Sequence, residues 1–514
     1  MESSIKRHKS VIVFFISLIF VTLFLNLSVS AQTVLAGTGK YNITKDIGEN
    51  IHDSLYVKAL VLKSNTVTMA IITLDVVSIE DYTLPKNFYQ EIKRKLKEEL
   101  HLDHFLINAS HNHWDGFLIG KNFVAEDVGD RTIKAVEKAL KNLEPVKFGG
   151  GSGFENRISM NRRIKLKDEK VYTIRHANPN MPDDEVVGLG KMDPEIGILR
   201  IDRLDGTSKA VLYNFACHPY SGVLDRGVTA EFPGFASETI ESVLGNNSMA
   251  FFLQGAAGDI TEILYKNVDD ARDCEPFGRM LGLSVLKGFN KIKPSTNQKV
   301  FNAISKTMDL PLRKDISNRI KELERQERKL LSSLRSTSLN MKSFIPLYIK
   351  YTLSPKYPSY YSYRYLQEDS LGILGLKMHD KENKRNIEKY LKNMRAMDKL
   401  SQIEENIMFL KRRQNDLKKL NKETITVDIV GIRIGNFVVV TFPGEPFAEV
   451  GLNIKKNSPF ENTFVAGYSN GYIHYAPTAN SYKEWGYEVM NSILAPEWQA
   501  KYENEISGIL EELK

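Results

Sequence analysis

Four short polar clusters of the sequence carry side chains suited to hydrolytic chemistry. Each cluster follows a run of apolar residues and so lies where a predicted strand ends, which is where α/β proteins place ligand-binding groups. The clusters are 108–113, 214–219, 254–261 and 442–446, and Tyr475 follows the last of them. We therefore expect one site that the fold assembles from segments far apart in the chain.

Two histidines and one glutamate from these clusters form a set typical of a hydrolytic zinc site. Such a site combines neutral imidazoles with an anionic oxygen and keeps one position open for water. His111, His218 and Glu445 supply this set, whereas the His-Glu-x-x-His motif of helical metalloproteases is absent from the sequence. Spacing alone also allows a second interpretation, in which these histidines are hydrogen-bonded structural residues.

The order of the clusters resembles the catalytic domain of the neutral (non-lysosomal) ceramidase family. That family shows His-Thr-His-Ser-Gly-Pro, Asn-Arg, Ala-x-His-Pro, Gly-Asp-x-Ser-Pro and Pro-Gly-Glu motifs, followed by a tyrosine-rich loop. The matching segments here are 111–116, 161–162, 216–219, 258–261, 443–445 and 472–475. The resemblance covers about 35–300 and 425–490 and does not include the C-terminal β-sandwich domain of long family members.

The resemblance implies an exported zinc-dependent amidohydrolase that cleaves the N-acyl bond of ceramide or a related lipid amide by metal-activated water. It implies Zn²⁺ bound by His111, His218, Glu445 and Tyr475. Tyr472 competes with Tyr475, which is alternatively a core residue. Two other functions stay open. One is a zinc hydrolase of the same fold acting on another amide or ester, such as an acylated sugar or cell-wall component. The other is a non-catalytic surface protein that retains the fold.

Four further residues receive catalytic roles from the same resemblance. His113 would transfer a proton or support a ligand, and Arg162 would anchor a polar group of the substrate or the developing oxyanion. Thr261 occupies the place of the active-site serine, and Asp259 would orient that loop. Structural roles stay open as well: a backbone hydrogen bond for His113, a turn for Asp259 and a helix cap for Thr261. Of Arg162 and its neighbour Arg163, one is expected to be a surface charge.

The sequence departs from the family pattern on the side that would face the substrate. Trp114 and Asp115 stand where the family has the small pair Ser-Gly, and Trp114 would narrow the mouth of the site. Thr261 replaces serine and Glu262 replaces proline. Because none of these changes touches the expected metal ligands, the metal site is the safer inference and ceramide the less certain substrate.

Strand and helix patterns alternate along most of the chain, which predicts an α/β class of mixed sheets flanked by helices. The expected helices are 85–100, 124–143 and 234–244. The expected strands are 54–63, 67–77, 104–108, 196–203, 208–216, 249–254, 425–434 and 437–442.

A charged segment, 313–423, interrupts this pattern. Apolar residues there recur at steps of three and four, which predicts two long helices forming an antiparallel hairpin. The predicted domains are therefore a catalytic α/β domain in two parts, 32–312 and 424–514, with this insertion between them. The tyrosine-rich stretch 344–365 at its tip is a candidate lid or membrane-surface contact, or else the aromatic core of an ordinary hairpin.

Composition excludes several classes of protein. The chain has 514 residues, 42% of them hydrophobic, which excludes a disordered protein. A net charge of +7, from 70 Lys plus Arg against 63 Asp plus Glu, is small for this length and argues against a nucleic-acid partner. The two cysteines, Cys217 and Cys274, are either one disulfide or two buried thiols.

The N-terminus has the pattern of a secretory signal peptide. Lys6, Arg7 and Lys9 precede an apolar run over 11–27, and small residues follow at 29–31. We expect a signal peptide over 1–31 or, alternatively, an uncleaved anchor formed by 11–27. In either case the protein is expected to be exported: secreted, periplasmic or held at the cell surface.

Overall fold

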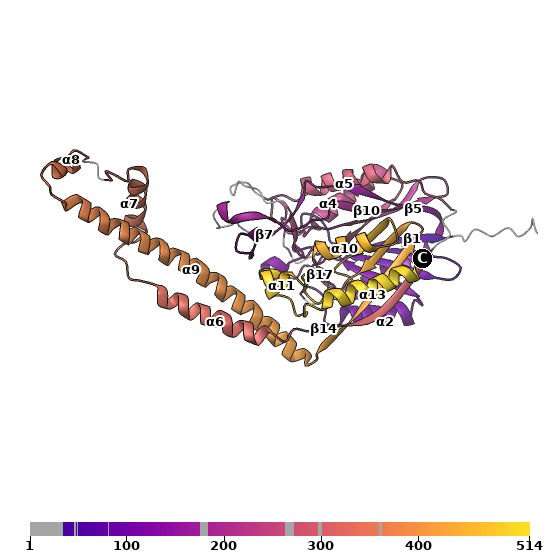
Figure 1. Ribbon diagram of the computed structural model, residues 1–514. Helices are drawn as coiled ribbons and strands as arrows, with labels where there is room; N and C mark the ends of the chain where they lie inside the picture. Colours follow the sequence, from indigo (N-terminus) through magenta and orange to yellow (C-terminus); the bar gives the residue numbers. More distant parts are fainter. Residues whose placement is uncertain are drawn as a thin grey trace, which may run out of the picture. The chain divides into compact units, whose positions relative to one another are not determined.

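The computed structural model describes residues 34–45, 48, 50–80, 82–174, 183–262, 272–296, 301–358 and 362–514. The predicted signal segment, 1–31, lies outside them. The described chain divides into two compact units. Unit 1 lies within Met1–Leu310, Thr426–Glu484 and Glu497–Lys514, and unit 2 consists of Pro311–Ile425 and Trp485–Pro496. Figure 1 labels their helices and strands.

Unit 1 contains an eight-stranded mixed sheet with the order β12-β11-β10-β5-β1-β2-β3-β4. The pairs β11–β12 and β3–β4 are parallel, and the other neighbours run antiparallel. The strands are β1 Leu35–Asn42, β2 Tyr56–Lys63, β3 Thr68–Leu74, β4 His104–Ala109, β5 Glu144–Phe154, β10 Glu195–Arg203, β11 Ser208–Phe215 and β12 Met249–Gln254. The predicted α/β class with mixed sheets is confirmed.

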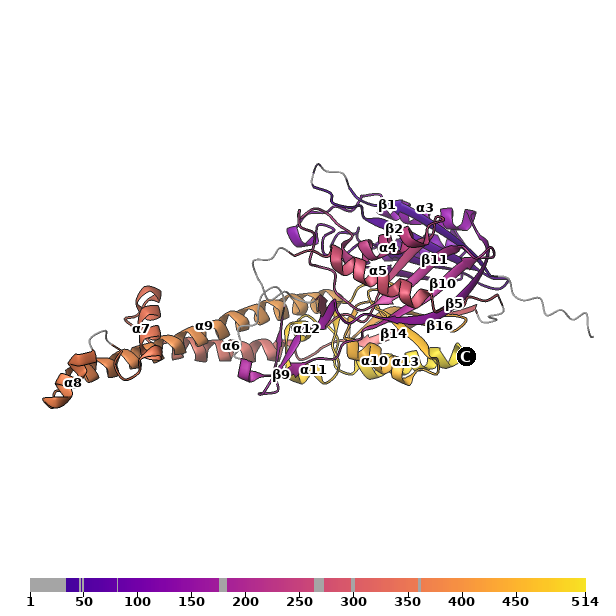
Figure 2. The ribbon, with the colours of Figure 1, turned by 90° about the horizontal axis from the view of Figure 1, so that it is seen from above.

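Both faces of this sheet are buried, so its strands are apolar at nearly every position. In β2, Val57 and Ala59 face one core while Leu60 and Leu62 face the other, as the two-residue period of a strand requires. Four helices cover the first face, and α4 and α5 lie side by side there (Figure 2). They are α2 Phe88–Glu98, α3 Val128–Lys141, α4 Glu231–Leu244 and α5 Glu275–Phe289.

A four-stranded sheet with the order β14-β15-β16-β18 packs on the second face. Two helices cover its outer side, which gives unit 1 four layers: helices, sheet, sheet, helices. The elements are β14 Phe301–Pro311, β15 Thr424–Ile434, β16 Phe437–Thr441, β18 Asn462–Ala466, α10 Ala448–Asn457 and α13 Trp498–Glu512.

Short elements complete the part of the chain that the structure describes. They are β6 Ser159–Asn161, β7 Arg163–Leu166, β8 Val171–Thr173, β9 Val186–Leu189, β13 Ile260–Glu262, β17 Glu445–Pro446, β19 Tyr475–Ala476, α11 Ser481–Glu484, α12 Tyr487–Met490, η1 Phe117–Ile119 and η2 Asp183–Glu185. Strand β13 pairs with β6, and β17 pairs with β19.

Unit 2 is built on the predicted helical insertion. Helix α6 (Ile316–Ser333) packs antiparallel against α9 (Gly375–Leu420), as the bonds from Gln414 to Ser317 and from Asn393 to Arg335 show. Helix α9 has 46 residues and begins well before the periodic segment that predicted it. The tip contains α7 Met341–Leu353 and α8 Ser362–Ser370. Buried residues from both long helices form its core, among them Ile320, Leu323, Ile403, Ile407 and Leu410.

Cys217 and Cys274 are both buried free thiols rather than a disulfide. None of the helices in the described ranges has the length and apolar character needed to cross a membrane.

We predict that Gly39→Ala destabilises unit 1, because α3 passes very close to β1 at this position. A Cβ atom at Gly39 would lie 2.0 Å from the carbonyl oxygen of Ala135, so the helix or the strand would have to shift. Overpacking of this kind costs about 1–3 kcal/mol in the free energy of unfolding. Thermal unfolding followed by circular dichroism measures the effect.

Gly508→Ala is the matched control. Gly508 lies in α13 with open space around its Cα, so the added methyl group stabilises the helix by up to about 1 kcal/mol. Equal melting temperatures for Gly39→Ala and the wild type would contradict the close packing of α3 on β1.

Candidate metal centre

The candidate site is built by loops at the carboxyl ends of strands in both sheets of unit 1. The loops after β4, β11 and β12 belong to the large sheet, and those after β16 and β18 belong to the small one. The pairing of β17 with β19 sets Glu445 beside Tyr475. The four sequence clusters therefore meet, although more than three hundred residues separate His111 from Glu445.

Backbone carbonyls orient the two histidines assigned as ligands. His111 Nδ1 donates to the carbonyl of Val77 at 2.6 Å, and His218 Nδ1 donates to that of Ala257 at 2.8 Å. Both rings are almost fully buried, and burial lowers the pKa of each well below its ordinary value. Each ring is therefore neutral at pH 7 and presents an unprotonated Nε2, the form that binds metal.

The unprotonated nitrogens face a carboxylate. Glu445 Oε2 lies 3.6 Å from His111 Nε2 and 3.2 Å from His218 Nε2. All three atoms are acceptors, and His218 Nε2 makes no hydrogen bond within the described part of the chain. Burying acceptors against one another is unfavourable unless a cation lies between them. Ligands around tetrahedral zinc are separated by about 3.3 Å, which is close to these distances.

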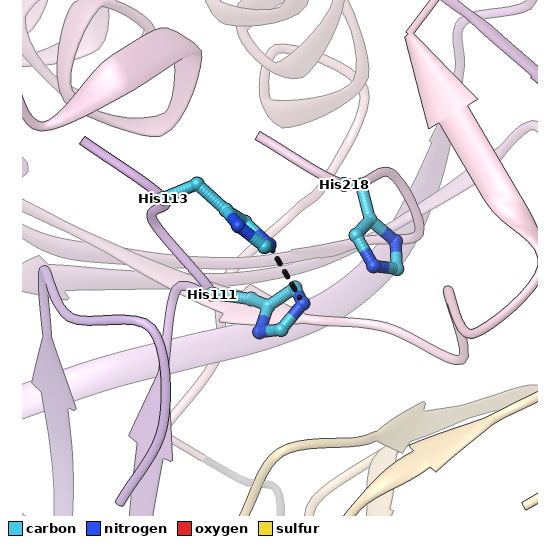
Figure 3. A group of neighbouring side chains, drawn as sticks. All are labelled: His111, His113 and His218. Carbon is cyan, nitrogen blue, oxygen red and sulfur yellow. Dashed lines mark hydrogen bonds between the residues drawn. The ribbon is translucent and has the colours of Figure 1, made fainter. Parts of the chain in front are cut away.

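The family resemblance implies a supporting or proton-transfer role for His113. In the structure it lies close enough to the other two histidines to be a ligand itself. Its Nε2 is 3.1 Å from His111 Nε2, and the side chains of His111, His113 and His218 point toward one another (Figure 3). Ligand atoms of the three residues all lie within 4.8 Å of one another. His113 is thus a candidate ligand as well as a candidate proton-transfer residue.

Two tyrosines hold Glu445 in place. The hydroxyl of Tyr468 donates to Glu445 Oε2 at 3.3 Å, and that of Tyr472 donates to Oε1. Burial and the nearby Glu445 raise the pKa of both phenols, so both remain donors. Tyr468 was not recognised in the sequence, although it lies in the polar run 467–472 directly after β18.

Tyr475 is connected to Arg162. Its hydroxyl accepts a hydrogen bond from Arg162 Nη2 at 3.2 Å, and the same nitrogen donates to the carbonyl of Gly258 at 2.7 Å. Arg162 is buried, which places a permanent cation beside the candidate centre. Arg163 is buried too and pairs with Glu484, so the expectation that one of the two arginines is a surface charge was wrong.

Asp259 fastens the loop that carries Thr261. Its carboxylate accepts hydrogen bonds from Asn161 Nδ2 at 2.7 Å and from the backbone of Ala448 at 2.8 Å. Thr261 is buried, and its hydroxyl is bonded to that of Tyr220, whose ring centre is 6.4 Å from that of His113. These contacts place Thr261 at the edge of the histidine group.

A glycine makes room for the large side chain of Trp114. A Cβ atom at Gly222 would lie 2.4 Å from the indole, and the φ of +75° at Gly222 also favours glycine. The indole nitrogen of Trp114 donates to the carbonyl of Tyr220 at 3.1 Å. The structure therefore has room for tryptophan at the position where the motif has serine.

The fold and the site define a mixed α/β protein with a candidate metal centre. Its structure is similar to neutral ceramidase from Pseudomonas aeruginosa, with a TM-score of 0.56 and 15% identity over 94% of this chain and 74% of that one. A ceramidase complexed with C2 gives a TM-score of 0.57 and 17% identity, with 94% and 75% covered. No family model and no curated protein matches the sequence. The fold is therefore ceramidase-like.

We predict that His218→Ala and Glu445→Gln each abolish tight zinc binding, because either change removes one of the converging acceptors. The wild type should retain stoichiometric zinc after dialysis, as measured by elemental analysis. His101→Ala, which removes an exposed histidine, is the control and should bind zinc like the wild type. Full zinc content in His218→Ala would refute the centre. If Tyr475 is the phenolic ligand, Tyr475→Phe should weaken zinc binding more than Tyr472→Phe, which removes only a hydrogen bond to Glu445.

A buried carboxyl pair next to Thr261 predicts how stability depends on pH. Burial raises the pKa of Glu231 from 4.5 to about 7, and burial together with Glu231 raises that of Glu262 well above 4.5. At these two groups the folded chain therefore binds more protons than the unfolded chain above pH 4.5, so their contribution to stability falls as pH rises toward 7.

Glu262→Gln should therefore gain in melting temperature relative to the wild type between pH 5 and pH 8, because it removes one of the two groups. Glu238→Gln, at an exposed position of α4, should leave the pH profile unchanged. An identical pH dependence of the melting temperature in the wild type and in Glu262→Gln would show that Glu262 does not titrate over this range.

Proposed function

We propose that the protein is an exported zinc-dependent amidohydrolase of the neutral ceramidase type. It cleaves the N-acyl bond of ceramide or a related lipid amide and releases a fatty acid and an amine. The observation that supports this most directly is the convergence of His111 Nε2, His218 Nε2 and Glu445 Oε2, three buried acceptors with no proton between them. The ceramidase-like fold supports the choice of reaction.

His111, His218, Glu445 and Tyr475 would hold the zinc ion in this proposal. Bound zinc supplies a Lewis acid that polarises the amide carbonyl and makes water a nucleophile near neutral pH. Tyr468 and Tyr472 fix the orientation of the glutamate through their hydrogen bonds.

The remaining residues act on charge and protons. Arg162 is a fixed buried cation beside Tyr475 and stabilises the negative charge that develops on the amide oxygen. The leaving amine needs a proton, and His113, whose Nε2 lies 3.1 Å from that of His111, would donate it. Thr261 lines the substrate side, and Asp259 positions its loop through Asn161 and Ala448.

A second substrate class has an observation of its own. A cavity of about 50 Å³ beside His113 is bounded by Trp114, Leu118, Phe123 and Val228, with Arg226 among its polar residues. This volume suits a short acyl group. It favours the alternative in which the enzyme deacylates a small amide or ester, such as an acylated sugar or a cell-wall component.

Export and lipid contact complete the proposal. The basic and apolar N-terminal pattern supports secretion, periplasmic location or attachment at the cell surface, with 11–27 as the anchor in the last case. The partner is a lipid or other small N-acyl molecule rather than a nucleic acid. Contact of 344–365 with a membrane surface would bring the protein to a lipid substrate.

The proposal predicts that Arg162→Met lowers kcat for hydrolysis of short-chain ceramide by about 100- to 1000-fold without loss of zinc. Lys165→Met, at an exposed position of the neighbouring strand, should keep full activity. A chelator should abolish fatty-acid release by the wild type, and added zinc should restore it.

The outcomes separate the two substrate classes. A zinc-loaded protein that releases acetate from acetylated sugars but no fatty acid from ceramide would favour the second class. Full activity on ceramide after complete removal of metal would exclude the proposed mechanism.

A further inference from the structure

Helix α7 at the tip of the insertion carries apolar residues on two sides, and one of these rows is exposed. One side packs on α9: the ring of Phe344 stacks on Tyr390 at 4.4 Å, and the hydroxyl of Tyr351 donates to Asp380 at 2.7 Å. The other side carries an aliphatic residue at every fourth position. These residues and their exposed fractions are Met341 57%, Ile345 45%, Ile349 49% and Leu353 81%.

A second exposed apolar group lies where α8 meets α9. The hydroxyl of Tyr365 donates to Asp380 at 3.1 Å, which is the carboxylate that also holds α7. Both groups therefore lie at the N-terminal end of α9, where Figures 1 and 2 show α7 and α8. The exposed members of this second group are Leu366, Leu371, Ile373, Leu374 and Met378. We call the two groups together the apolar tip.

The charge beside α7 has one sign over a long stretch, whereas Glu368 and Asp369 lie among the residues of the second group. Residues 328–367 contain no Asp or Glu. The basic residues of that stretch are Arg328, Lys329, Arg335, Lys342, Lys350, Lys356 and Arg364. Lys342 and Lys350 belong to α7 itself, next to members of the aliphatic row. The basic surface of α7 therefore repels an identical copy of itself and attracts an anionic surface.

Exposed rows of aliphatic residues with flanking lysines are what an interfacial helix requires. The aliphatic side chains enter the boundary between headgroups and acyl chains, and the basic residues bind anionic headgroups. Exposed Tyr348 and Tyr363 suit the same boundary, because one end of each ring is apolar and the other polar. The tyrosines Tyr351 and Tyr365, by contrast, are tied to Asp380.

We propose that the apolar tip docks on the surface of a bilayer containing anionic lipid. The aliphatic row of α7 inserts, and Lys342 and Lys350 contact the headgroups. The membrane contact suggested under the proposed function is thereby made by α7 and requires anionic lipid. It does not depend on the zinc chemistry, so binding and hydrolysis are measured separately.

Flotation of the full chain with vesicles tests this proposal. Vesicles of phosphatidylcholine with one fifth phosphatidylserine should bind the wild type at least tenfold more tightly than vesicles of phosphatidylcholine alone, and 0.5 M NaCl should weaken the binding. The double variant Ile345→Asp/Ile349→Asp should lose at least tenfold in affinity. Val243→Asp, at an exposed apolar position of α4 in unit 1, is the control and should bind like the wild type.

Charge reversal separates the two contributions. Lys342→Glu/Lys350→Glu should remove the preference for phosphatidylserine while keeping the zinc content and helicity of the wild type. Unchanged binding by both double variants would overturn the proposal, as would a wild type that binds neither kind of vesicle. If the wild type sediments as a dimer and Ile345→Asp/Ile349→Asp sediments as a monomer, the surface binds a second copy of the chain instead. Hydrolysis of a soluble short-chain amide, unaffected by these variants, reports on the proposed function alone.

Discussion

Three buried acceptors that face one another without a proton are the constraint on which the site depends. His111 and His218 donate their Nδ1 protons to backbone carbonyls, so the Nε2 atom of each presents a lone pair to Glu445. Protonating either ring would pair it with the carboxylate, but burial opposes this by lowering both pKa values. A divalent cation would relieve the repulsion and would give His218 Nε2 the partner that it lacks among the described residues.

The scaffold keeps these atoms in place through contacts that do not involve a metal. Tyr468 and Tyr472 donate to the two oxygens of Glu445 and limit its rotation. His111 has a φ of +65° and His474 a φ of +63°, conformations that a non-glycine residue adopts only when its surroundings impose them. The two-sided burial of the large sheet supplies that rigidity, since the ends of its strands cannot move without disturbing both cores.

Much of this arrangement could be predicted from the sequence. The features that could not be predicted depend on contacts between different loops, on the conformation of one turn or on exposed helix surface. Polar clusters directly after apolar runs can be recognised in the sequence, and they made His111, His218 and Glu445 candidates. The order of the clusters, which resembles that of the ceramidase motifs, supported this choice. Tyr468 was missed, since its role depends on a hydrogen bond between loops of different strands. The approach of His113 to His111 likewise depends on the turn that begins at a positive φ. In unit 2 the periodicity predicted the core contacts of α9 but not its length, because its N-terminal half is largely exposed and carries little apolar pattern.

The most direct test of the proposed zinc centre is anomalous diffraction at the zinc absorption edge from crystals of the zinc-loaded protein. The structure predicts one strong peak about 2.0–2.2 Å from His111 Nε2, His218 Nε2 and a carboxylate oxygen of Glu445, with a phenolic or third imidazole ligand completing the set. Zinc-saturated crystals with no peak between these side chains, or with zinc held elsewhere in unit 1, would contradict the account.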